Sequence, residues 1–107
     1  MEIKELIDFI KVEARRLEQR FGKEADHEKT ILSSSVKLYE ELGELSELVL
    51  SSKQRKEKNV DANKEALADE FADVLIAVSM LAHDMNVDIE EALKNKIKKI
   101  NKRYEPS

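Results

Sequence analysis

The sequence contains two pairs of acidic residues, and the two members of each pair are three positions apart. Glu41 and Glu44 occur in the segment EELGELSE, and Glu70 and Asp73 occur in DEFADVL. Residues at this spacing lie about 60° apart around an α-helix, so each pair presents both carboxylates to one side. Four carboxylates that converge in a low-dielectric interior repel one another, so protons or a cation must compensate them. The two pairs therefore predict a divalent-metal site between two helices.

The helical positions around the first pair separate inward-facing from outward-facing acids. An advance of about 100° per residue places Glu41 inside the apolar arc of its helix and Glu44 at the edge of that arc, whereas Glu40 and Glu47 point to the polar side. An E-x-x-E pair alone is common on a solvated helix. This first motif therefore indicates a site only together with the second.

The second pair lies in a stretch that is otherwise apolar. Between Phe71 and Ala82 the only polar side chains are Asp73 and Ser79. A solvated surface position is hard to reconcile with such a stretch, and the remaining alternative is a core aspartate with an unidentified partner. We therefore predict four carboxylates as metal ligands and catalytic residues: Glu41, Glu44, Glu70 and Asp73.

The residue types also restrict which metal the site can hold. The chain contains no cysteine, so a bound metal must rest on oxygen or imidazole ligands. A di-iron bundle would carry E-x-x-H on its helices, and neither pair contains histidine. Oxygen ligands suit Mg²⁺, with Mn²⁺ as the alternative, and Mg²⁺ favours phosphate oxygens. A phosphate-bearing substrate is therefore expected.

The elements that must position these residues are four helices, at about residues 2–21, 28–51, 61–84 and 88–104. Apolar residues recur every three or four positions in each of these segments, and the 107 residues include only two glycines and one proline. The sequence predicts an all-α fold, a four-helix bundle in one domain over residues 1–107. The polar segment SSKQRKEKNVDANK is the longest predicted loop, although part of it can be frayed helix.

Local signals predict where these helices begin and end. Gly22 can end the first helix, Asp26 or Thr30 can cap the second, and Asp88 with Glu91 can form a capping box at the start of the fourth. The apolar seam of the fourth helix consists of Ile89, Leu93, Ile97, Ile100 and Tyr104.

The third helix is apolar nearly all round, and three partner helices of similar length would struggle to enclose it. We therefore expect a homo-oligomer, a dimer or a tetramer, with this helix near its centre. No apolar run reaches the roughly 18 residues that span a bilayer, and the start MEIKELIDFIK has no signal-peptide pattern. A cytoplasmic location without a membrane partner is expected.

Basic residues are unevenly distributed along the chain. The net charge of −4 argues against nucleic acid as a partner, yet residues 94–103 include six basic residues and no acidic one. The candidates for binding substrate phosphates are Lys37, Lys96, Lys99 and Arg103. A solvated basic face is the alternative for the last three. Ser34 is a further candidate for lining the pocket, His27 is expected at the surface or as a cap, and Tyr39 is expected in the core.

Four segments in this order resemble a known family: KLYEELGEL at 37–45, DEFADVL at 69–75, VDIEEAL at 87–93 and KRY near the end. Over roughly residues 27–104 the chain is similar to MazG-like nucleotide pyrophosphohydrolases. The resemblance implies an all-α oligomer in which E-E-x-x-E and E-x-x-D bind Mg²⁺, with Glu40 as the first acid. It also implies hydrolysis of (deoxy)nucleoside triphosphates to the monophosphate and pyrophosphate. The chain departs from the family pattern at Ile100, where many members have asparagine.

Three other functions remain open at this point. The first is the cleavage of phosphoribosyl-ATP, which a relative on the same scaffold performs. A non-catalytic helical interaction module would bind no metal, and a nucleic-acid binder would use the basic C-terminal helix.

Overall fold

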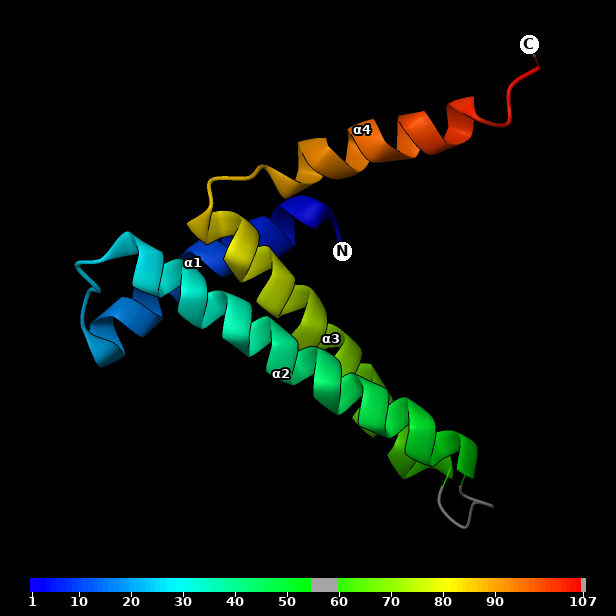
Figure 1. The fold of residues 1–107 in the computed structure, drawn as a ribbon, viewed down its shortest axis with the longest axis horizontal. Coiled ribbons are helices and arrows are strands. Elements are labelled where there is room, and N and C mark those ends of the chain that lie inside the picture. Colours follow the sequence, from blue (N-terminus) through cyan, green and yellow to red (C-terminus); the bar gives the residue numbers. More distant parts are fainter. Residues whose placement is uncertain (55–59, 107) are drawn as a thin grey trace.

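The computed structural model describes residues 1–54 and 60–106, which form four α-helices (Figure 1). The helices are α1 (Ile3–Phe21), α2 (His27–Gln54), α3 (Val60–Asp84) and α4 (Ile89–Lys102). No strand occurs in this described part of the chain, and the prediction of an all-α fold is confirmed. Over the same residues, no helix combines the length and the apolar character that crossing a membrane requires.

Local signals fix the ends of three helices. Gly22 follows α1 with a φ of 84°, a conformation that glycine adopts without a side-chain clash. The Asp26 side chain accepts a hydrogen bond from the backbone N–H of Glu28 at 3.0 Å, and the Asp88 side chain accepts one from that of Glu91 at 3.1 Å. Of the two predicted caps for α2, the aspartate therefore fulfils the role.

The C-terminal end of α3 is a turn that does not use glycine. Asn86 has a φ of 56°, and its backbone N–H donates to the carbonyl of His83 while the N–H of Val87 donates to the carbonyl of Ala82. This pair of bonds is the Schellman arrangement, in which asparagine can replace glycine at the left-handed position. The turn directs the chain away from α3 into α4.

The two helices that flank the predicted polar loop both extend into it. α2 continues to Gln54 and α3 begins at Val60, so both ends of the predicted loop are helical. Residues 55–59 of that loop lie outside the described residues.

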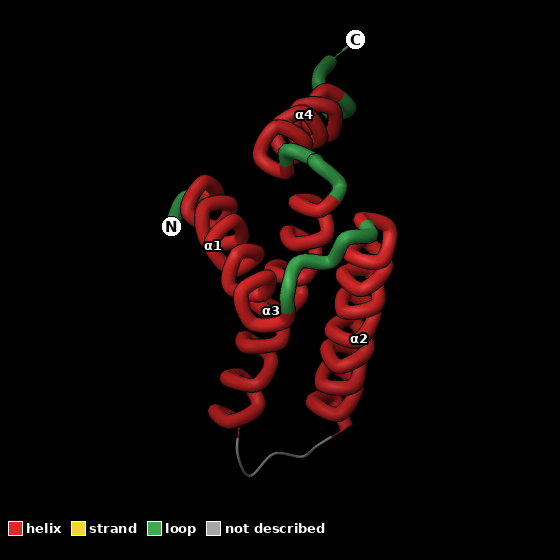
Figure 2. The backbone as a smooth tube through the Cα atoms, turned by 90° about the vertical axis from the view of Figure 1, so that its left-hand side faces the viewer, coloured by secondary structure: helices red, strands yellow, loops and turns green. Residues whose placement is uncertain are grey.

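The helices α2 and α3 are antiparallel and lie side by side along their lengths (Figures 1 and 2). α1 crosses α3 near the C-terminal end of α3. Ile10 on α1 and Ala77 on α3 are the buried apolar residues among those described. Ser79 on α3 is also buried, and its hydroxyl donates to the Leu75 carbonyl at 2.7 Å. The pair of α2 and α3 is therefore the frame on which a site can be built.

The last helix, α4, extends away from the other three (Figure 1). It makes no extensive contact with them, and none of its residues is buried. The radius of gyration is 17.3 Å, whereas a compact domain of about 100 residues has a value of about 13 Å. The predicted seam of α4 thus faces solvent, because the chain offers no surface against which this seam packs.

Candidate metal centre

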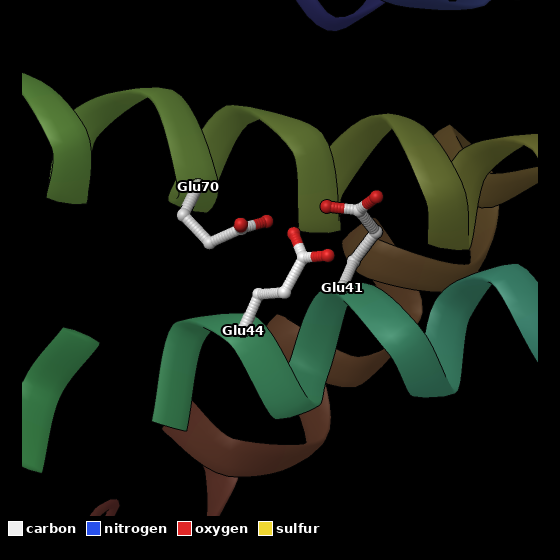
Figure 3. A group of neighbouring side chains, drawn as sticks. All are labelled: Glu41, Glu44 and Glu70. Atoms are coloured by element: carbon white, nitrogen blue, oxygen red, sulfur yellow. The ribbon is translucent and has the colours of Figure 1, made fainter. Parts of the chain in front are cut away.

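Three of the four predicted acids meet between the middle of α2 and the facing part of α3 (Figure 3). Carboxylate oxygens of Glu41, Glu44 and Glu70 all lie within 4.8 Å of one another. Glu41 and Glu44 are one helical turn apart on α2, and Glu70 reaches toward them from α3. The i, i+3 spacing and the antiparallel pairing of the helices together create this acid cluster.

Two of these carboxylates are removed from water. Glu41 is 5% exposed and Glu70 is 6% exposed, whereas Glu44 is open to solvent. One oxygen of each buried group, Oε2 of Glu41 and Oε2 of Glu70, has no hydrogen-bond partner. A buried polar atom without a partner costs about 1–3 kcal/mol, and more when it is charged. The cluster therefore has unused ligand capacity that is directed inward.

A proton partly compensates the charge of the cluster. The hydrogen bond with Glu41, burial and the nearby Glu44 raise the pKa of Glu70 from 4.5 to about 8. The hydrogen bond with Glu70, and then the one with Lys37, lower the pKa of Glu41. At neutral pH, protonated Glu70 therefore donates to ionised Glu41. A metal ion that enters the cluster would replace this proton.

One cation contacts the cluster within the described residues. Lys37 Nζ lies 2.9 Å from Glu41 Oε1, one turn earlier on α2. The Lys37 side chain is 63% exposed, and its hydrogen bond with Glu41 raises its pKa further. Lys37 thus serves as a counter-ion to Glu41 and remains accessible from solvent.

The donor set fits a hard divalent cation. All the available ligand atoms are carboxylate oxygens, and unpaired oxygens point into the space between the helices. Mg²⁺ and Mn²⁺ prefer such ligands, and Mg²⁺ usually keeps several waters beside one or two carboxylates. Glu41, Glu44 and Glu70 could hold such an ion, with the solvent side open to a ligand.

The fourth predicted acid, Asp73, lies outside the group of three and is exposed. Glu41 and Glu70 face each other across the antiparallel pair. Around the axis of α2 the side chain of Glu44 is rotated by about 60° from that of Glu41, and around α3 the side chain of Asp73 is rotated by the same angle from that of Glu70. Because the two helices are antiparallel, both rotations lead to the same side of the helical pair. Asp73 therefore points to the same open side of the helical pair as Glu44, outside the group of three carboxylates. Its predicted inward orientation is not observed in the single chain.

The predicted basic residues of α4 do not reach the cluster within one chain. Lys96, Lys99 and Arg103 are exposed, and in the described part of the chain none of them forms an ion pair with an acid of the cluster. Glu40 is also exposed. The structure thus brings Lys37 to the acids and leaves the α4 cations apart from them.

Three other predicted positions can be placed. Tyr39 is 75% exposed, so its expected place in the core is wrong, because its part of the apolar arc turns away from α3. His27 is exposed, as predicted. The Ser34 hydroxyl donates to the Asp84 carboxylate, which joins the start of α2 to the end of α3. Sequence reasoning missed this link, since residues 50 positions apart give no local signal.

Two hollows near α1 contain none of the four acids. One of about 740 Å³ lies where α1, the start of α2 and the end of α3 meet, and one of about 380 Å³ lies between α1, the end of α3 and the turn into α4. Neither offers a cluster of three or more acidic or histidine ligands among the described residues. The chemistry of the acids, and not cavity size, locates the candidate site.

Comparison with known proteins identifies the family of the chain. The model of the MazG-like family matches residues 32–106, which include all four acids, α3 and α4. No curated protein and no solved structure matches the chain significantly. The family match extends over more than half of the chain, and the chain belongs to the MazG-like family.

Proposed function

We propose that this protein hydrolyses (deoxy)nucleoside triphosphates to nucleoside monophosphates and pyrophosphate, with Mg²⁺ as cofactor. Membership of the MazG-like family points to nucleotide pyrophosphohydrolase activity in general. The observation that carries the specific proposal is the acid cluster, in which two buried carboxylates each keep an unpartnered oxygen. Mn²⁺ is the alternative cofactor.

The roles of the residues follow from their exposure. Glu41 and Glu70 would anchor the metal from the buried side, while Glu44 and Asp73 would complete its ligands from the open side. A Mg²⁺ ion held by these carboxylates would supply electrostatic stabilisation of the charge that develops on the leaving pyrophosphate. A carboxylate of the open side would accept the proton of the attacking water.

Lys37 is proposed to contact the phosphates. It stands at the border between the buried acids and solvent, and a cation entering the cluster would reduce the need for Lys37 as counter-ion of Glu41. Its ammonium group would then be available to an anionic substrate. Glu40, beside it on the exposed side of α2, is proposed to orient substrate groups that carry hydrogen-bond donors.

A second copy of the chain is part of the proposal. The chain exposes 8968 Å², whereas a compact monomer of 12.3 kDa exposes about 6,100 Å². An obligate dimer buries roughly 2,000–5,000 Å² in total, so the excess on each copy is sufficient for such an interface. We propose a dimer or tetramer, in which Lys96, Lys99 and Arg103 could serve a substrate bound to another copy.

The test is the release of pyrophosphate from a panel of canonical and modified nucleoside triphosphates, and from phosphoribosyl-ATP, with and without Mg²⁺. Mg²⁺-dependent release from nucleoside triphosphates supports the proposal. Turnover of phosphoribosyl-ATP alone would replace the substrate class. No release from any compound, with no Mg²⁺-dependent shift in melting temperature, would favour a non-catalytic interaction module instead.

A further inference from the structure

The larger hollow near α1 has the size and the wall chemistry of a site for a flat, polar ring. It lies where the end of α1, the start of α2 and the end of α3 meet (Figure 1). Its volume is about 740 Å³, and ligand pockets usually measure about 300–1,000 Å³. The rings of Phe21, His27 and His83 lie on its walls, and all three residues are exposed. Because such rings can stack on a nucleobase, the hollow suits a heteroaromatic ligand.

Two hydrogen-bond acceptors are fixed on one wall of this hollow. Oδ2 of Asp84 accepts a hydrogen bond from the Ser34 hydroxyl, and both residues are half-buried. Oδ1 of Asp84 has no hydrogen-bond or ion-pair partner among the described residues. A carboxylate has no proton to donate, and the Ser34 hydroxyl already uses its own, so both groups can only accept from a ligand. This wall therefore repels a phosphate and is matched to a ring that carries N–H donors.

The hollow lies on the same side of the helical pair as Glu44 and Asp73. Ser33, which lines the hollow, and Glu44 are eleven residues apart on α2. Asp84 and Asp73 are eleven residues apart on α3. Eleven steps of about 100° complete three turns and add about 20°, so the two members of each pair lie along one side of their helix. The hollow and the open side of the acid cluster therefore belong to one continuous side of the pair.

Lys37 lies between the hollow and the acid cluster. It follows Ser34 by one helical turn and precedes Glu41 by one turn, and its Nζ is 2.9 Å from Glu41 Oε1. The path from Ser34 to Glu41 along α2 is about 10 Å, which the sugar and phosphates of an extended nucleotide can bridge. A triphosphate held at Lys37 and the acids would therefore place its base in the hollow.

We propose that this hollow binds the base of the nucleoside triphosphate and that Asp84, positioned by Ser34, selects bases with an exocyclic amino group. Cytosine and adenine present such an amino donor, whereas thymine and uracil present a carbonyl oxygen at the corresponding position. The amino group donates to Oδ1 of Asp84, while a carbonyl oxygen there faces another acceptor and leaves both without a partner. The position of the phosphates rests on the proposed function, which this inference extends to the choice of base.

Discrimination between paired substrates tests this assignment. The measured quantities are the ratio of kcat/KM for dCTP to that for dUTP and the ratio for dATP to that for dITP, because the bases of each pair differ in an amino group against a carbonyl. The natural protein should favour the amino base roughly tenfold in both pairs. Asp84→Asn should lose this preference, since its amide can still accept the bond from Ser34 but also presents an N–H donor to the base.

The matched control is Asp8→Asn, which removes an exposed acid of α1 outside the hollow. It should keep the preference of the natural protein. Each ratio compares two substrates on one protein, so a loss of folded enzyme in a variant does not change it. A natural protein without preference, or an Asp84→Asn variant with the natural preference, would overturn the proposal.

Binding of free nucleosides separates this inference from the proposed hydrolysis. Deoxycytidine and deoxyuridine carry no phosphate, so neither requires the acid cluster for binding. In two-dimensional NMR spectra of the natural protein, deoxycytidine should shift the backbone amide signals of Ser33, Ser34 and Asp84 more than deoxyuridine does at the same concentration. Equal shifts with both nucleosides, or no shift with either, would overturn the base site. A preference for deoxycytidine in a protein that hydrolyses no triphosphate would instead remove the proposed activity and keep the base site.

Discussion

Glu70 of α3 meets Glu41 of α2 inside the helical pair, and the pKa values of the two carboxyls move in opposite directions. Glu70 keeps its proton to about pH 8, while Glu41 stays ionised beside Lys37. The buried part of the cluster therefore carries one negative charge at neutral pH instead of two. This arrangement lets the helices pack without a cation and leaves an exchangeable proton at the position a metal would take.

Metal binding should release that proton. Because Glu70 is protonated below about pH 8, binding one Mg²⁺ near pH 7 should release about one proton. The apparent affinity should rise about tenfold per pH unit up to about pH 8 and then level off. Isothermal titration calorimetry in buffers of different ionisation enthalpy measures both quantities. An affinity that does not change between about pH 6 and 8 would show that Glu70 is not displaced by the metal.

The metal-free protein should lose stability as pH rises from about 4.5 to about 8. The pKa of Glu70 is raised in the folded state, so over this range the folded protein binds more protons than the unfolded chain, and unfolding becomes easier with increasing pH. Glu70→Gln keeps a neutral group, so its melting temperature should depend less on pH. Thermal melts in chelator should show this difference, with Glu47→Gln, an exposed acid on the polar side of α2, as control. Parallel pH profiles of the three proteins would contradict the protonation of Glu70.

Removal of Lys37 should affect substrate binding more than folding. The ion pair with Glu41 is largely exposed on the lysine side, and such pairs contribute about 0–1 kcal/mol to stability. We expect Lys37→Ala to melt within a few degrees of the natural protein and to raise KM for a nucleoside triphosphate roughly tenfold, with a smaller change in kcat. Steady-state kinetics would measure this, with Lys29→Ala as a matched lysine near the start of α2. Equal effects of both substitutions would remove Lys37 from the site.

Asp73 should matter for the reaction and not for the fold. Its side chain is exposed in the single chain, so Asp73→Asn should leave the helical content and the oligomer mass unchanged. If Asp73 completes the metal ligands from the open side, kcat should fall at least 100-fold and the Mg²⁺ affinity should fall with it. Glu65→Gln, another exposed acid on α3, should have neither effect. Undiminished turnover by Asp73→Asn would limit the metal site to the cluster of three.

Much of this arrangement could be read from periodicity and local signals. The step of about 100° per residue correctly separated buried Glu41 from exposed Glu40 and Glu47, because α3 covers one side of α2. Gly22, Asp26 and Asp88 marked helix ends through backbone preferences that require no tertiary contact. These features depend on residues within one or two turns.

Features that depend on distant neighbours could not be predicted in this way. Apolar periodicity shows that Tyr39 and Ile97 lie on apolar faces but does not show what covers each face, and both are exposed in the single chain. The apolar sequence neighbours of Asp73 predict that its side chain faces inward, yet this side chain is exposed in the single chain. The hydrogen bond between Ser34 and Asp84 joins the start of α2 to the end of α3, and no spacing in the sequence predicts it.

We propose that nucleoside triphosphates are hydrolysed at the acid cluster and that this hydrolysis depends on Mg²⁺. The most direct measurement is Mg²⁺-dependent pyrophosphate release by the natural protein, by Glu41→Gln and by Glu47→Gln under the same conditions. We predict that the natural protein and Glu47→Gln release pyrophosphate at similar rates, and that Glu41→Gln is at least 100-fold slower while remaining helical. Equal rates for Glu41→Gln and Glu47→Gln would contradict the assignment of the reaction to this cluster.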